Sequence, residues 1–89
     1  MNKTLEELRK EIDVIDEELL QVLAKRMHIV REIGKLKKEH NITPLDEDRW
    51  QEVLHQIIET AKKHNLPETS IKKIYELIHD TALSIEKEL

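Results

Sequence analysis

The sequence predicts an all-α fold of three helices, one long and two shorter. Of its 89 residues, 38% are apolar and 38% are charged, and the only aromatic residues are one Trp and one Tyr. Material for strands is therefore scarce, while the apolar residues recur every three or four positions, the period of an amphipathic helix. With one Gly and two Pro in the chain, breaks are few. We expect a single helical domain over residues 1–89.

The first predicted helix runs from about residue 4 to residue 39. Thr4 and Glu7 have the spacing of a capping box, which satisfies backbone N–H groups where a helix starts. Gly34 is the one weak point, and the segment before Pro44 ends the helix, because a residue that precedes proline disfavours helical geometry. Nine apolar residues, here called the apolar stripe, lie along this helix: Leu5, Leu8, Ile12, Ile15, Leu19, Val22, Ile29, Ile33 and Leu36.

The second and third predicted helices span about residues 46–64 and 67–88. Asp46 is a suitable N-cap for the second helix, which stops near Asn65. Pro67 suits the first turn of the third helix. Both helices carry an apolar face at helical spacing: Trp50, Val53, Leu54, Ile57, Ile58 and Ala61 in one, and Ile71, Ile74, Tyr75, Ile78, Ala82, Ile85 and Leu89 in the other.

A cation interrupts the apolar stripe at Arg26, between Val22 and Ile29. An unpaired charge at such a position costs several kcal/mol, so Arg26 needs an anionic partner, either a ligand or a carboxylate of another helix. Lys37 lies eleven residues later on nearly the same side of the helix, about 16 Å along the axis. Two long cationic side chains therefore look toward one volume, as a site for a small dicarboxylate requires.

The proportions of the chain predict a homodimer. A helix over residues 4–39 is about 54 Å long, whereas a compact chain of this length has a diameter of only ~30 Å. An intertwined antiparallel homodimer would cover the rest of the apolar stripe, although a plain coiled coil has the same periodicity. Arg9 lies about 25 Å from Arg26 along the axis. In an antiparallel pair that crosses near residue 23, Arg9 of one chain comes level with Lys37 of the other.

Composition excludes several classes of function. The net charge of −4 and the interspersed signs argue against a nucleic-acid surface. No apolar segment is long enough for a membrane span, and no signal peptide is recognisable, so we expect a cytoplasmic protein. The chain has no Cys, which excludes thiolate chemistry. Its five His lack the spacing that would pair two of them on one helix face, so we expect no metal and no cofactor.

The ordered motifs resemble one enzyme family. Leu8-Arg9, Ile12-Asp13 and Ile15-Asp16 are followed by Leu23-Ala24-Lys25-Arg26, Ile33-Gly34-Lys35-Leu36-Lys37 and Asp46-Glu47-Asp48-Arg49. This set, which extends over essentially the whole chain, is similar to that of the all-α (AroQ-type) chorismate mutases. The resemblance implies an isomerase of phenylalanine and tyrosine biosynthesis that converts chorismate to prephenate by an intramolecular [3,3] rearrangement.

The resemblance also implies roles for individual residues. Arg9 would be donated across the dimer, and Arg26 and Arg49 would clamp the carboxylates of the dianionic substrate. Lys37 and Glu86 would face its ether oxygen, so that Lys37, Glu86 and Arg26 carry catalysis, and Asp46 would lie near its hydroxyl. Each role has a plain alternative: a surface charge for Arg9 and Lys37, a helix cap for Asp46, a local ion pair for Arg49 and a solvated carboxylate for Glu86.

Three positions depart from the family pattern. Trp50 stands where many members have the glutamate that contacts the ring hydroxyl, His79 where an apolar residue often lines the pocket, and Ala82 where some have serine. Trp50 would be either a core anchor or a substrate contact. Two other functions therefore stay open: an isochorismate-pyruvate lyase, which uses a similar cation clamp, and a catalytically silent dimerisation or regulatory module.

Overall fold

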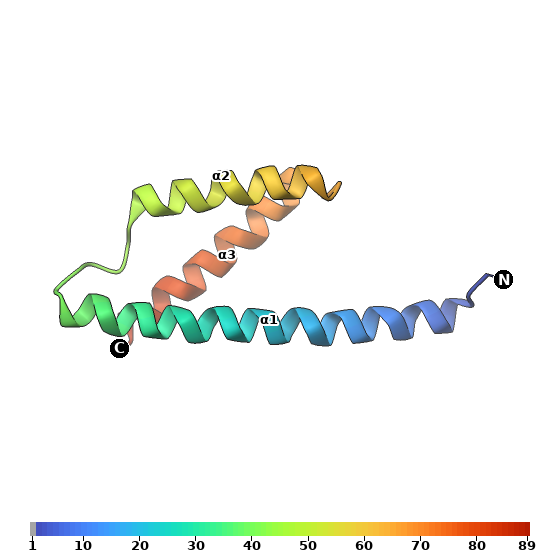
Figure 1. Ribbon diagram of the computed structural model, residues 1–89, viewed down its shortest axis with the longest axis horizontal. Coiled ribbons are helices and arrows are strands. Elements are labelled where there is room, and N and C mark those ends of the chain that lie inside the picture. Colours follow the sequence, from blue (N-terminus) through green and yellow to red (C-terminus); the bar gives the residue numbers. More distant parts are fainter. Residues whose placement is uncertain (1) are drawn as a thin grey trace.

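The computed structural model describes residues 2–89 as three helices joined by two short connections (Figure 1). Helix α1 spans Leu5–Glu39, α2 spans Glu47–Lys63 and α3 spans Glu68–Lys87. The prediction of an all-α chain with three helices is confirmed, and residues 2–89 contain no strand. None of the helices in this part of the chain is both long enough and apolar enough to span a membrane.

Local signals explain where the helices start and stop. The Thr4 side chain accepts a hydrogen bond from the Glu7 N–H while Glu7 returns one to the Thr4 N–H, which completes the predicted capping box. Asp46 caps α2 by accepting from the Arg49 N–H at 3.0 Å. In both connections an asparagine in the left-handed region directly follows the C-cap histidine, Asn41 at φ 56° and Asn65 at φ 55°. Asn tolerates this conformation better than other side-chain-bearing residues, so it ends a helix at low cost.

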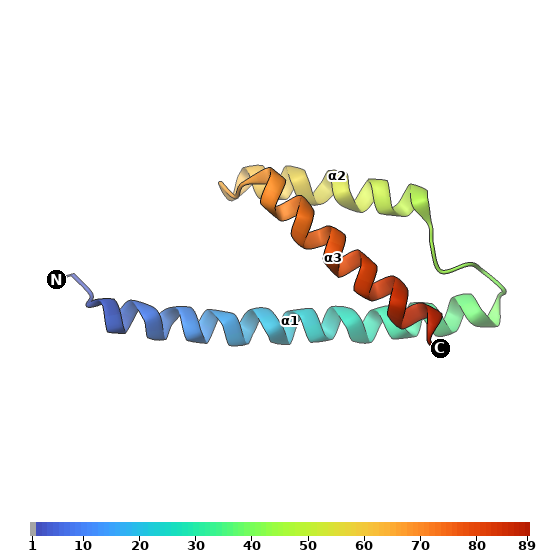
Figure 2. The same cartoon turned by 180° about the vertical axis from the view of Figure 1, so that it is seen from behind.

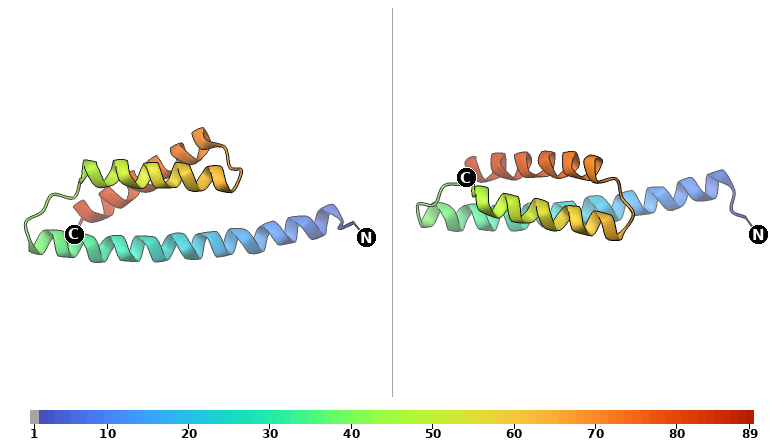
Figure 3. Two further views of the ribbon diagram at one scale, coloured as in Figure 1. Left: turned by 45° about the horizontal axis from the view of Figure 1, so that its top comes forward. Right: turned by 90° about the horizontal axis from the view of Figure 1, so that it is seen from above.

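Helix α3 holds the molecule together. It runs diagonally from the end of α2 to the C-terminal part of α1 and packs against both (Figures 2 and 3). Helices α1 and α2 make no comparable contact with each other. The relative position of α1 and α2 is therefore set through α3 and through the connection over residues 40–46.

Gly34 is the point of close approach between α1 and α3. A Cβ atom at this position would lie 3.1 Å from Cγ and 3.3 Å from Cα of Glu86, and 2.5 Å from Cδ1 of Leu89. The helix continues unbroken through Gly34, which is buried. The weak point of the sequence thus serves packing, because a missing side chain lets the backbone of α3 come close to α1.

Little of the apolar surface is covered within one chain. The longest dimension is 59 Å and the radius of gyration is 16.7 Å, against about 12 Å for a compact chain of this length. All nine residues of the apolar stripe remain 44–63% exposed. Val30, Ala61 and Ala82 are the buried apolar side chains of the described residues. A single chain therefore lacks a core of ordinary size.

Candidate active site

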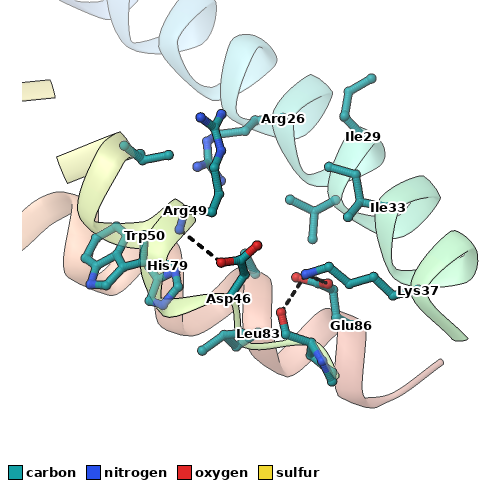
Figure 4. Close-up of a pocket in the computed structure, with 14 residues that line it drawn as sticks. Arg26, Ile29, Ile33, Lys37, Asp46, Arg49, Trp50, His79, Leu83 and Glu86 are labelled. Carbon is teal, nitrogen blue, oxygen red and sulfur yellow. Dashed lines mark hydrogen bonds and ion pairs between the residues drawn. The ribbon is translucent and has the colours of Figure 1, made fainter. Parts of the chain in front are cut away.

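A cavity of about 410 Å³ lies where the three helices face one another (Figure 4). Each helix contributes a stripe of residues spaced by three or four positions, so one face of each helix lines the cavity. The connection between α1 and α2 adds Pro44. The lining consists of Arg26, Ile29, Val30, Ile33 and Lys37 from α1, Asp46, Arg49, Trp50 and Val53 from the start of α2, and His79, Ala82, Leu83 and Glu86 from α3.

Arg26 and Lys37 are the first and the last of the α1 residues that line the cavity. Arg26 is half-buried and forms no ion pair with any of residues 2–89, so the predicted carboxylate partner on α2 or α3 is not found there. Lys37 is more enclosed, with its side chain 19% exposed. Its ammonium donates a hydrogen bond to the Pro44 carbonyl, which ties the connection to the end of α1. Both cations point into the volume that their spacing predicted.

Glu86 is the least exposed charged group of the site. Its side chain is 9% exposed, and its Oε1 lies 2.9 Å from the Lys37 Nζ. This contact has the length of an ion pair but not the angle of a hydrogen bond, because Oε1 is buried without a hydrogen-bond partner among residues 2–89. A buried oxygen without a hydrogen-bond partner is costly, and it is available to a ligand. The sequence-based alternative of a solvated Glu86 is therefore wrong.

The start of α2 brings Asp46 and Arg49 to the cavity. One Asp46 oxygen is occupied by the capping bond to the Arg49 N–H. The Arg49 guanidinium pairs with Glu52, one turn further along α2, and its side chain is 60% exposed. An exposed ion pair of this kind contributes little to stability, so a ligand carboxylate can compete with Glu52 for Arg49.

Trp50 and His79 form one wall of the cavity. Their rings are stacked, with centroids 4.0 Å apart and planes 9° from parallel. Both side chains are half-buried, so Trp50 joins α2 to α3 and also faces the cavity. The stack agrees with the role of an anchor in the packing, while the alternative role of a substrate contact stays a prediction.

The structure brings together five of the six predicted site residues and leaves one apart. Arg26, Lys37, Asp46, Arg49 and Glu86 line the same cavity. Arg9 lies on the exposed N-terminal half of α1, about 25 Å along the axis from Arg26. The sequence did not predict the hydrogen bond from Lys37 to the Pro44 carbonyl. It also did not predict that Gly34 lets α3 bring Glu86 close to α1. The i, i+7 spacing of His79 and Glu86 was the available signal that both line one face of α3.

The arrangement can hold a small anion. Three cations and two carboxyl groups converge on a cavity whose remaining walls are mostly apolar. Its lining, among residues 2–89, includes no serine, threonine or cysteine, and no cluster of three or more His, Asp or Glu in the same range could hold a metal ion. The chemistry offered is fixed charge and shape, which act by orienting a ligand and stabilising developing charge.

Comparison with known proteins assigns this helical, cation-lined fold to a family. The model of the family "Chorismate mutase type II" matches residues 8–87. The chain therefore belongs to the type II chorismate mutases, a family of isomerases.

Similar proteins include one named as a chorismate mutase and others named as bifunctional enzymes with a chorismate mutase part. The chain is 27% identical to the chorismate mutase of Methanocaldococcus jannaschii over 88 residues, which cover 99% of this chain and 89% of that protein. It is 35% identical over 88 residues to the bifunctional chorismate mutase/prephenate dehydratase of Aquifex aeolicus, with 96% of this chain and 24% of that protein covered. The corresponding Escherichia coli K12 protein is 32% identical over 82 residues, 92% of this chain and 21% of its own length. The chain thus spans about a quarter of the bifunctional relatives.

Proposed function

We propose that this chain is a chorismate mutase that converts chorismate to prephenate. The observation that carries the proposal is the gathering of Arg26, Lys37, Arg49 and Glu86 around one cavity in a chain of this family. Chorismate carries two carboxylates and an ether oxygen, and the cavity offers three cations and one buried carboxyl group. The proposal includes a cytoplasmic location, since a chain without cysteine suits a reducing compartment.

The reaction needs orientation and charge, not a covalent partner. The ether C–O bond breaks while a new C–C bond forms within the same molecule, so no nucleophile takes part and no proton must be transferred. Arg26 and Arg49 would hold the two carboxylates and keep the flexible substrate in its compact conformer. Lys37 would stabilise the negative charge that grows on the ether oxygen as its bond breaks.

Glu86 would act in its protonated form. Its carboxyl group lies against the Lys37 ammonium. A substrate whose ether oxygen enters between them needs a donor from each side, and an ionised carboxylate can only accept. A protonated Glu86 would donate a hydrogen bond to the ether oxygen.

A second copy of the chain would complete the site. The apolar stripe is exposed along α1, and the single chain has no core of ordinary size. An antiparallel partner that crosses α1 near residue 23 would cover the stripe and bring its Arg9 level with Lys37, because the two are equidistant from the crossing. Such an isologous pair forms two equivalent sites. We therefore propose an intertwined homodimer in which Arg9 is supplied across the interface.

The test is the turnover of chorismate by the purified protein. Loss of chorismate is followed by ultraviolet absorbance, and prephenate is identified by its acid conversion to phenylpyruvate. Saturable formation of prephenate is the predicted result. Elimination of pyruvate from isochorismate, without prephenate formation, would show a lyase instead, and a folded protein inactive on both compounds would show a silent module.

A further inference from the structure

The stacked pair of Trp50 and His79 places a hydrogen-bonding edge in the cavity. Stacking at 4.0 Å covers one face of the imidazole with the indole and fixes the plane of the ring. The polar atoms of histidine, its two ring nitrogens, lie at the edge of that plane. Because His79 is half-buried and lines the cavity, this edge is the polar part of an otherwise largely apolar wall, as Figure 4 shows beside Asp46.

His79 stands apart from the groups that serve the ether oxygen. It lies seven residues before Glu86 on α3, on the same helix face and about 10 Å away along the axis. On α2, Trp50 directly follows Arg49, and Asp46 lies one turn earlier. The imidazole therefore borders the part of the cavity beside Asp46 and Arg49. Two substrate oxygens on neighbouring carbons, each with one hydrogen bond, span about 9 Å, so side chains whose backbones are about 10 Å apart can reach such a pair from its two sides.

The chemistry of the lining matches His79 to one substrate group, which it would share with Asp46. The three cations only donate hydrogen bonds and match the carboxylates and the ether oxygen, while an ionised Asp46 only accepts. The remaining polar group of chorismate is the hydroxyl on its ring, which both donates and accepts. It sits on the carbon next to the one that bears the ether oxygen. A neutral imidazole has one donor and one acceptor nitrogen, so it can meet this hydroxyl in either sense.

We propose that His79, held in place by its stack on Trp50, binds the ring hydroxyl of the substrate and makes the site select a hydroxyl-bearing ring. This inference rests on the proposed function for the identity of the ligand. Trp50 is then a positioning residue, which acts by orienting the imidazole. A buried hydrogen-bonding group left without its partner is costly, so a ring without the hydroxyl would be bound less well.

The test compares two ligands, chorismate and the analogue in which hydrogen replaces the ring hydroxyl. Trp50 is the one tryptophan of the chain, so its fluorescence, followed by stopped flow before chorismate is converted, reports binding at the stack and gives dissociation constants for both ligands. His79→Phe keeps an aromatic ring for stacking and removes both nitrogens. We predict that this substitution lowers the preference for chorismate over the analogue about tenfold, through weaker binding of chorismate alone. His79→Asn or His79→Gln, which restores a hydrogen-bonding group, should recover part of the preference.

Two comparisons separate a binding role from a structural one. His55→Phe makes the same change on the exposed face of α2 and should leave the preference unaltered. In turnover assays, Trp50→Phe should keep the preference and Trp50→Ala should lose it. Equal weakening of both ligands by His79→Phe, or no weakening of either, would overturn the inference.

The outcome also distinguishes this inference from the proposed function. A wild-type protein that binds chorismate without forming prephenate would refute the mutase proposal, yet the change in preference on His79→Phe would still decide the role of His79. A wild-type protein that forms prephenate but keeps its full preference after His79→Phe would refute the inference and leave the mutase proposal intact. Failure to bind either ligand would refute both.

Discussion

The contact between Lys37 and Glu86 concentrates the chemistry of the site in two side chains. Both side chains are largely buried, and the Lys37 Nζ lies 2.9 Å from the Glu86 Oε1. The Lys37 ammonium and the Glu86 carboxyl group face one another at the place where we propose that the ether oxygen binds. An ether oxygen that accepts hydrogen bonds from both groups needs them about 5 Å apart, so this contact has to open when the substrate binds.

Removal of the Lys37 ammonium tests its part in this arrangement. Loss of one preorganised donor to a developing oxyanion costs about 3–4 kcal/mol in the barrier, so Lys37→Ala should lower kcat on the order of 10²-fold or more. Steady-state kinetics on chorismate measure the effect. Lys35→Ala, on an exposed position of the same turn, is the matched control and should stay near the wild type. Near wild-type kcat in Lys37→Ala would remove this lysine from the mechanism.

Substitution of Glu86 tests whether the reaction needs a hydrogen-bond donor at this position. The amide of Glu86→Gln donates a hydrogen bond and cannot ionise, so this variant should keep most of its kcat. Glu86→Ala has no donor and should lower kcat on the order of 10²-fold. Steady-state kinetics on chorismate measure both effects, with Glu88→Gln at the exposed end of α3 as the control. Equal losses in Glu86→Gln and Glu86→Ala would remove the donor role from Glu86.

The crossing of α3 over α1 is what delivers Glu86 to the site. Gly34 allows the approach, since a Cβ there would press on the Glu86 backbone at 3.3 Å and on the Leu89 side chain at 2.5 Å. The leucine can rotate away, whereas the backbone of α3 has to shift. Helix position and chemistry are therefore coupled through a single missing side chain.

A substitution at Gly34 should separate activity from stability. Overpacking costs about 1–3 kcal/mol, while alanine gains about 1 kcal/mol in helix propensity over glycine, so the free energy of unfolding in Gly34→Ala should change by no more than ~2 kcal/mol. The displacement of Glu86 should lower kcat about tenfold. Denaturant unfolding and steady-state kinetics measure the two effects.

The same crossing allows a control that relieves only part of the clash. In Gly34→Ala/Leu89→Ala the flexible side chain is gone but the contact with the Glu86 backbone remains. Activity should therefore stay low in the double variant. Full recovery would mean that Leu89, not the position of Glu86, caused the loss in Gly34→Ala.

The limits of each helix could be predicted from sequence because their signals are local. Thr4 with Glu7, Asp46, and the asparagines at 41 and 65 act within a few residues of themselves. The cations of α1 could also be assigned to one volume, since helical periodicity alone relates Arg26 to Lys37. The crossing at Gly34 and the Trp50–His79 stack could not, because each joins two helices whose relative position depends on tertiary packing.

The whole molecule has a shape that one chain does not explain. It is 59 Å long with a radius of gyration of 16.7 Å, and no large side chain among residues 2–89 is fully buried. The apolar stripe extends along α1 beyond the reach of α3. The dimer that we propose would give these residues a core and would also place Arg9 of each chain beside Lys37 of the other, so stability and catalysis would depend on the same interface.

Complementation between two inactive variants tests whether two chains share each active site. Arg9→Ala and Lys37→Ala are co-expressed with different affinity tags, and the mixed dimer is isolated by purification on both tags. One of its two sites then contains an intact Arg9 and an intact Lys37, while the other lacks both. We predict turnover of chorismate to prephenate at about half the wild-type rate per dimer, far above either variant alone. A mixed dimer no more active than its parents, or a protein that does not dimerise, would contradict a site shared between two chains.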